Sequence, residues 1–228
     1  MLSFKSNEVG AKKINLSNKT VRSIFTIQFT NLTKGEQTRQ MIIEKAAPLF
    51  NKNGYAGTSL TDIMKATGLA KGGLYGNFKN KDEIAAVTFD YAIAKVKTAV
   101  MQAICNCQTC QEKLYAILDF YSTYITNPPI SGGCPLLNTS VEADDSFPFL
   151  KTRARAAQNE MLASLVQIFQ VGKKNGEFKK EIQPQREGEM MYALIEGGIV
   201  MAKINDAPTI LHRILDRIHE HIKQDLII

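Results

Sequence analysis

The chain has 228 residues, 44% hydrophobic and 22% charged, as expected of a globular protein with a sizeable core. It has no run of eighteen apolar residues, and no apolar stretch follows its N-terminal lysines. We therefore expect neither a transmembrane helix nor a signal peptide, and we place the chain in the cytoplasm with no membrane partner. Residues 1–81 hold thirteen Lys and Arg against four Asp and Glu, a net charge of +9 that leaves −3 for the rest. This asymmetry favours nucleic acid as a partner.

Residues 1–35 are polar and basic and show no helical stripe, so we expect a disordered or loosely ordered N-terminal extension. Within it, Ile24–Phe29 alternates like a short strand that has no obvious partner. The helical pattern begins near Thr33.

Helix starts are marked by three polar pairs spaced three residues apart, in which side chains can satisfy free backbone N–H groups. These pairs are Thr33 with Glu36, Ser59 with Asp62, and Asn80 with Glu83. Gly54 and Gly68 can end the first two helices in a left-handed conformation. The predicted helices therefore run from about Thr33 to Asn53, from Ser59 to Gly68, from Lys71 to Phe78, and from Asn80 to about Cys105.

The remainder also shows helical periodicity, interrupted at Pro and Gly. The predicted segments are 111–126, 134–142, 149–174, 185–204 and 208–226. We thus predict an all-α fold: an N-terminal three-helix, helix-turn-helix head at 36–82, joined by a long helix to a larger C-terminal ligand-binding and dimerisation body at 83–228. No flexible linker is expected, so a rigid helix would connect head and body.

Two short helices around the turn Gly68-Leu69-Ala70 have the spacing of a helix-turn-helix. A helix that enters the major groove needs small, polar or basic outward residues. The outward set fits this need: Ala70, Lys71, Gly72, Gly73, Gly76 and Asn77. The alternative is a glycine-rich loop between two core helices.

The run Thr58–Glu83, TSLTDIMKATGLAKGGLYGNFKNKDE, resembles the DNA-binding signature of the TetR family of bacterial regulators. The matching positions are Thr58, Asp62, Ile63, Gly68, Lys71, Gly72, Leu74, Tyr75, Phe78, Lys79 and Lys81. The detailed resemblance covers about residues 36–85, and the turn Gly133-Cys134-Pro135 followed by Asn138 and Glu142 is similar to one subgroup. The resemblance implies a homodimeric repressor without enzyme activity or cofactor, which binds a palindromic operator in double-stranded DNA and is released by a small effector.

The resemblance implies two groups of DNA-binding residues. Residues in phosphate-contacting positions are Tyr75 and Lys81, with Thr58 or Ser59 helping at a helix N-terminus. Residues in base-facing positions are Lys71, Gly72, Gly73 and Gly76, with specificity also resting on Asn77 and on DNA shape. Ala70 departs from the pattern, because it replaces a capping Ser or Thr. For Tyr75 the alternative role is core packing.

Effector and dimer sites are expected in the body. A mainly apolar effector, of aromatic or cationic character, would contact Phe120, Tyr121, Tyr124, Met161, Leu165 and Phe169. The resemblance implies a dimer interface on the last two long helices, through Tyr192, Ile195, Gly198, Ile199, Ala202, Ile214 and Ile218. Packing within the chain's own core is the alternative for both sets.

Candidate redox residues are Cys105, Cys107 and Cys110, which we expect to be reduced. On a continuous helix Cys105 and Cys107 point about 200° apart, and no His or acid completes a zinc pattern, so no metal site is predicted. A thiol-based or metal-responsive sensor on the same fold remains the alternative function. A small helical enzyme lacks a nucleophile beside a base, and an architectural DNA binder would have a fully packed body.

Overall fold

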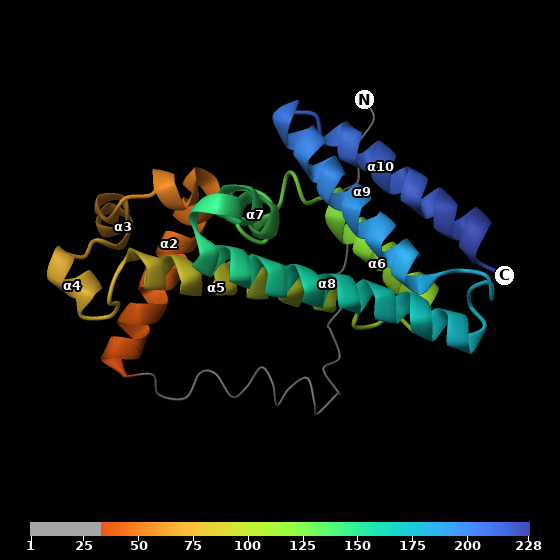
Figure 1. The fold of residues 1–228 in the computed structure, drawn as a ribbon, viewed down its shortest axis with the longest axis horizontal. Coiled ribbons are helices and arrows are strands. Elements are labelled where there is room, and N and C mark those ends of the chain that lie inside the picture. The colour runs from red at the N-terminus through yellow and green to blue at the C-terminus, as the bar shows by residue number, and fades with distance from the viewer. Residues whose placement is uncertain (1–32) are drawn as a thin grey trace, which may run out of the picture. The chain divides into compact units, whose positions relative to one another are not determined.

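Helices make up most of the described part of the chain, residues 33–228, in this computed structural model (Figure 1). Their order is α2 (Lys34–Gly57), α3 (Leu60–Thr67), α4 (Lys71–Tyr75), α5 (Lys81–Ile104), α6 (Cys110–Ser122), α7 (Pro135–Ser146), α8 (Pro148–Asn175), α9 (Pro184–Ile204), α10 (Pro208–His221) and a π-helical turn, η1 (Ile222–Leu226). The predicted all-α class is confirmed. Among these helices none is both long and apolar enough to span a bilayer. The N-terminal extension predicted at 1–35, with its strand at Ile24–Phe29, lies outside the described residues up to residue 32.

The predicted caps form at the starts of α3 and α5. The Ser59 hydroxyl accepts a hydrogen bond from Asp62 N at 3.2 Å, and Asp62 in turn accepts from Ser59 N at 2.9 Å. Asn80 Oδ1 accepts from Glu83 N at 2.9 Å. Free N–H groups at the first turn are thereby satisfied, which fixes where each helix begins.

Residues 38–228 form one compact unit, whose head is built from α2, α3, α4 and the start of α5. Its core is a small cluster of buried side chains: Ile42, Ala46, Ile63, Leu74, Phe78 and Ile84. Arg39 covers this core, with its guanidinium 4.0 Å from the Phe78 ring centroid and 2.9 Å from Glu83 Oε1. The helix predicted to reach Phe78 ends at Tyr75, although Phe78 N still bonds to Leu74 O at 3.0 Å.

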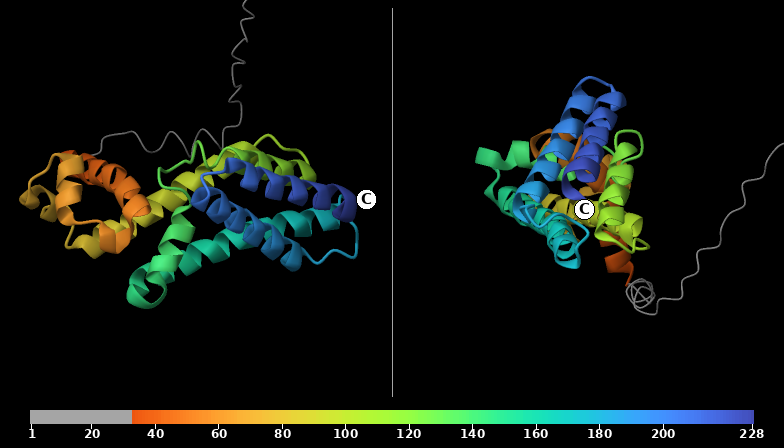
Figure 2. Two further views of the ribbon diagram at one scale, coloured as in Figure 1. Left: turned by 90° about the horizontal axis from the view of Figure 1, so that it is seen from above. Right: turned by 90° about the vertical axis from the view of Figure 1, so that its right-hand side faces the viewer.

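The body is built from the rest of α5 and from α6 to α10, with α8 packed against α7 and α9. Figures 1 and 2 show α9 and α10 side by side. A Cβ atom at Gly198 of α9 would lie 2.8 Å from Leu211 Cδ1 of α10, so glycine permits this close approach. After α8, Phe178 is fully buried and pairs with Ile227, which holds the C-terminal end of the chain against the body.

Candidate DNA interface and body cavity

Helix α4 presents small residues and one large aromatic residue to solvent. A Cβ atom added at Gly72 would meet no described atom within 4 Å outside its own turn, so packing within the chain does not require glycine there. Tyr75 is 44% exposed, which excludes the core-packing alternative for this side chain. Exposed Lys71 has its Nζ 5.8 Å from the Tyr75 ring centroid. Helix α4 therefore exposes the Lys71 ammonium group, the Tyr75 ring and the backbone at Gly72 to solvent.

Two of the predicted DNA-binding side chains serve the fold instead. Thr58 is fully buried, and its hydroxyl donates to Gly54 O at 2.7 Å, which leaves Ser59 as the more accessible of the two predicted residues at this helix start. The Asn77 side chain donates from Nδ2 to Gly73 O at 2.8 Å, and the backbone carbonyl of Asn77 accepts a hydrogen bond from the Arg39 guanidinium. These bonds close the end of α4 and leave Asn77 less free to read bases.

The other predicted contact residues lie at or near the surface. Ser59 is exposed but acts as the N-cap of α3, while Gly76 is exposed beside Gly72 O. Gly73 packs against Leu69, because a Cβ atom at Gly73 would lie 3.4 Å from Leu69 Cβ. Lys81 Nζ lies 4.2 Å from the ring centroid of Tyr55, whose hydroxyl donates to Asp82. The head thus places Lys81 at the start of α5, against α2.

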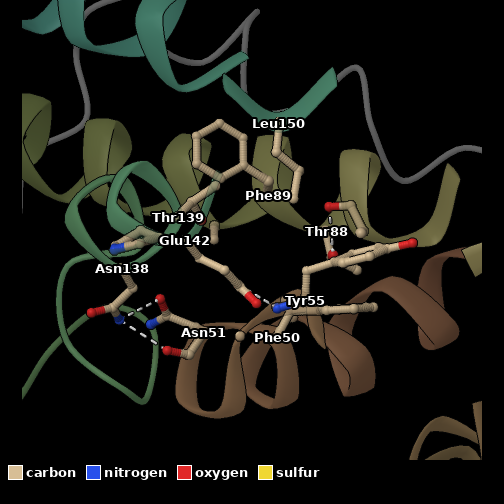
Figure 3. Close-up of a pocket in the computed structure, with 14 residues that line it drawn as sticks. Phe50, Asn51, Tyr55, Thr88, Phe89, Asn138, Thr139, Glu142 and Leu150 are labelled. Carbon is tan, nitrogen blue, oxygen red and sulfur yellow. Dashed lines mark hydrogen bonds between the residues drawn. The ribbon is translucent and has the colours of Figure 1, made fainter. Parts of the chain in front are cut away.

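A polar junction that sequence reasoning missed joins α2 of the head to α7 of the body. Glu142 of α7 accepts a hydrogen bond from Tyr55 N at 2.6 Å (Figure 3) and another from Ala56 N at 2.7 Å. These N–H groups are free because Gly54, with φ +75° and ψ 176°, breaks the helical hydrogen bonding inside α2. A Cβ atom at Gly54 would lie 2.6 Å from Glu142 Oε2. At the predicted helix end at Gly54, the helical hydrogen bonding is therefore interrupted. A carboxylate from the body accepts hydrogen bonds from the backbone N–H groups that this break leaves without helical partners.

Asn138, one turn before Glu142, completes the junction. Its Nδ2 donates to Asn51 O at 2.9 Å and to Asn51 Oδ1 at 3.0 Å (Figure 3). Asn51 Nδ2 in turn donates to the carbonyls of Ser131 at 3.1 Å and Gly133 at 3.0 Å. The sequence marked Asn138 and Glu142 as a subgroup pattern but gave no role for them.

A cavity of about 330 Å³ lies between α5, α6, α8 and α9, within the range of small-molecule sites. Of the six predicted effector contacts, Tyr121, Met161 and Leu165 line it. Further walls come from Val96, Val100, Ile104, Ile117, Ile168 and Tyr192, with Lys97 paired to Glu160. The lining is therefore mainly apolar.

The other three predicted effector contacts do not line this cavity. Phe169 is buried against Phe178, with ring centroids 5.8 Å apart, because it lies on the face of α8 next to the one that lines the cavity. Tyr124 is buried with its centroid 5.3 Å from Tyr121, and Phe120 packs edge-on against Tyr121. These three side chains therefore pack against other aromatic rings of the body and not at the cavity surface.

Glu196 of α9, one helical turn after the lining residue Tyr192, is only 8% exposed. Cys134, the N-cap residue of α7, donates from Sγ to Glu196 Oε1 at 3.3 Å. Burial raises the pKa of both groups, and the Cys134 hydrogen bond offsets this only in part for Glu196. Glu196 Oε2 has no hydrogen-bond partner among the described residues.

Most of the predicted dimer residues belong to the chain's own core. Those buried within the chain are Ile195, Gly198, Ile199, Ala202 and Ile218, as in the alternative of packing within the chain's own core. Tyr192 lines the cavity, and Ile214 is half-buried beside α9. The buried residues are not on the surface because the hydrophobic stripe of α9 to which most of them belong packs against α10 of the same chain.

The exposed apolar residues of α9 form a second stripe, which we call the α9 outer face: Met190, Leu194, Met201 and Ile204, with Gly197 among them. Ile210 and Ile214 of α10 adjoin it across a groove that Arg213 and Arg217 also line. Met201 is 51% exposed. The α9 outer face and this groove form a continuous apolar surface.

The three cysteines of the cluster are free thiols that differ in exposure. Helix α5 ends at Ile104, and Cys105 is exposed, Cys107 half-buried and Cys110 buried. Burial raises the pKa of Cys107 and Cys110, which lowers the fraction of reactive thiolate. Across residues 33–228, no group of three His, Cys, Asp or Glu side chains is placed to hold a metal ion.

A helix-turn-helix head with an open, basic second helix, set on a helical body with an apolar cavity, defines a DNA-binding transcription regulator. The sequence matches the family model "Bacterial regulatory proteins, tetR family" over residues 42–87 and the model "Tetracyclin repressor-like, C-terminal domain" over residues 110–218. The chain belongs to the TetR family of transcriptional regulators, which is not a family of enzymes.

Similar proteins extend over most of the chain. A TetR regulator from Chloroflexus aurantiacus is 36% identical with a TM-score of 0.83, and the match covers 86% of this chain and all of that one. The HTH-type regulator YxaF of Bacillus subtilis is 26% identical over 82% of this chain and 96% of its own. The repressor DhaR from a Mycobacterium strain is 20% identical over 73% and 82%.

Proposed function

We propose that the protein is a cytoplasmic repressor that binds a palindromic operator as a homodimer and is released by a small, mainly apolar effector. The observation that carries the DNA-binding part is α4, where Lys71, Gly72 and Tyr75 form an open surface that packing within the chain does not explain. Bare backbone at Gly72 would allow close approach to base edges, while Lys71 and Tyr75 contact bases or phosphates. Repression is supported by the function of the relative DhaR.

The dimer interface that we propose is the α9 outer face together with the adjoining groove on α10. Its members Met190, Leu194, Gly197, Met201 and Ile204 follow one another at steps of four, three, four and three residues. This is the spacing of a seam between two packed helices. Two copies of the face would bury apolar side chains that are otherwise in water, around a twofold axis that matches a palindrome.

Coupling between effector and operator would run through α7 as well as α5. Tyr192 lines the cavity, and Glu196 one turn later bonds to Cys134, which caps the start of α7. The same helix carries Glu142 to the backbone of α2 in the head. An effector that binds better to a shifted position of α7 would therefore favour a different head position and lower operator affinity.

The test is a mobility shift with DNA from immediately upstream of the protein's own gene, over a series of salt concentrations. We expect sequence-selective binding that weakens as salt rises. Tyr75→Ala and Lys71→Ala should each lower the affinity about tenfold, whereas Lys180→Ala, an exposed lysine in the body, should not. Equal affinity of all three variants and the wild type would contradict the assignment of α4 as the DNA-binding surface.

A further inference from the structure

Glu196 is a buried carboxyl group with an unused acceptor. It is 8% exposed, its Oε1 accepts from Cys134 Sγ at 3.3 Å, and its Oε2 has no partner among the described residues. A buried carboxylate oxygen without a hydrogen bond destabilises the folded state, so its presence needs an explanation. Packing offers none, because a neutral residue of the same size would avoid this cost.

The groups that interact electrostatically with Glu196 are all acids or phenols: Tyr121 of α6, Tyr124 just after it, Cys134 before α7, and Tyr192 of α9. None of them carries a positive charge. The surface cation that lines the cavity, Lys97, is already paired with Glu160. Within residues 33–228 the body therefore supplies a site for negative charge but not its counter-charge.

Glu196 follows lining residues of the cavity on α9. Tyr192 and Ile195 both line the cavity, and Glu196 follows Tyr192 by one helical turn, on the same side of α9. Tyr121 lines the cavity from α6. Tyr121 and Tyr192 thus line the cavity and also interact with Glu196, and aromatic faces attract cations.

We propose that the effector is an apolar cation, an amine or a quaternary ammonium on a hydrocarbon or aromatic frame, with Glu196 as its counter-charge and with Tyr121 and Tyr192 around its charged group. The inference rests on the proposed function, because it takes the cavity to be the effector site. Attraction between opposite charges is strong where water is excluded, so one buried carboxylate suffices to select a cation over a neutral molecule of the same shape.

The same arrangement predicts how binding depends on pH. Burial raises the pKa of Glu196, so at low pH the group is protonated and neutral. A cation binds better to the ionised form, and its affinity therefore rises with pH until the raised pKa is passed and then levels off. Tyr121, Tyr124, Tyr192 and Cys134 all have pKa values raised by burial and stay neutral over this range.

The experiment compares phenyltrimethylammonium with tert-butylbenzene, which has the same shape but no charge, by calorimetric titration of the full chain. We expect the cation to bind about tenfold more tightly or better, and Glu196→Gln to remove this preference while leaving tert-butylbenzene within about twofold. The matched control is Glu160→Gln, which removes a carboxylate at the same cavity and should leave the preference intact. Wild-type affinity for the cation, but not for the neutral probe, should rise with pH.

Equal binding of the two probes, or a preference that survives Glu196→Gln, would overturn the assignment of Glu196, while binding of both would still support the cavity as a ligand site. Binding of neither probe would overturn the Glu196 proposal together with the cavity. Addition of the cation to the operator complex tests the proposed function separately. Tight, Glu196-dependent binding that leaves the DNA complex intact would sustain the cation site and contradict effector-controlled release.

Discussion

The head buries Ile42 and Ile63 completely and covers its core with an ion pair between Arg39 and Glu83. The body, by contrast, encloses a cavity of about 330 Å³ and leaves an oxygen of buried Glu196 without a partner among the described residues. Cavities and unsatisfied buried groups both cost stability, on the order of 1–3 kcal/mol for the polar group alone. The difference indicates that the well-packed head holds its surface in one fixed shape. The body, in contrast, is incompletely packed at the cavity, and a bound ligand would fill this space.

The largest expected effect concerns the face through which two bodies would pair. Met201→Glu places a charge in the middle of the α9 outer face, and the dimer should weaken about a hundredfold or more, since the charge would lose its water on association. Sedimentation equilibrium at micromolar concentration measures the dissociation constant of the dimer. Val141→Glu on α7 is the matched control, because Val141 is also exposed but lies outside this face. A dimer unaffected by Met201→Glu would place the interface elsewhere.

Packing in the two regions can be compared with one substitution. Gly172→Ala in the body brings a Cβ atom to 2.5 Å from Phe178 Cδ2 and 3.0 Å from Cys110 Cβ. The free energy of unfolding should fall by about 2 kcal/mol because the buried ring must move. Gly72→Ala in the head meets open space and should raise it by about 0.5–1 kcal/mol through helix propensity. Chemical denaturation of both variants measures the two changes in the free energy of unfolding. If both substitutions changed it in the same direction, the proposed difference in packing between head and body would be contradicted.

The junction between the regions should show a smaller effect. Glu142→Gln replaces one carboxylate oxygen with an NH₂ group, which cannot accept from the backbone N–H of Tyr55 or Ala56. The loss should be about 1–2 kcal/mol, with faster amide hydrogen exchange at residues 55 and 56. Asp144→Asn on the same helix, an exposed partner of Lys151, is the control. Unchanged exchange at residues 55 and 56 would mean that Glu142 does not hold α2.

The smallest expected effect is a difference in pH dependence between two glutamates. Hydrogen bonds from Lys79 N and Arg39 lower the pKa of Glu83 below 4.5, so its stabilisation is present at neutral pH and is lost as the pH falls through that lowered value. Burial raises the pKa of Glu196, so its ionisation costs stability as the pH rises above 4.5. At pH 7, Glu83→Gln should therefore lower the free energy of unfolding and Glu196→Gln should raise it. Both differences should shrink in acid, and thermal melts from pH 3 to 7 would show whether they do.

The sequence predicted the head more accurately than the body because its signals are local. Ser59 with Asp62 and Asn80 with Glu83 fix helix starts through bonds that span three residues, and the match from Thr58 to Glu83 lies within one motif. Even there, the predicted helix end at Gly54 did not reveal that the Thr58 hydroxyl would bond to Gly54 O and be buried. Local sequence signals thus predict where helices begin, but they are less reliable for whether a single side chain is buried or exposed.

In the body, which face of a helix is buried depends on partners distant in sequence. Both stripes of α9 are apolar, and the packing of α9 against α8 and α10 buries Ile195 and Ile199 while Leu194 and Met201 stay outside. The bonds of Glu142 to Tyr55 and Ala56 likewise span almost ninety residues. Such pairings cannot be read from spacing in one sequence, which is why three predicted effector residues lie outside the cavity lining and five predicted dimer residues lie in the chain's own core.

The most direct measurement of the central claim is the operator affinity of Gly72→Ala, relative to the wild type at the same salt concentration. If α4 lies in the major groove, the added methyl group meets DNA, and affinity should fall about tenfold although the variant is the more stable protein. A more stable variant with unchanged operator affinity would contradict the account, because the surface at Gly72 would then not face DNA.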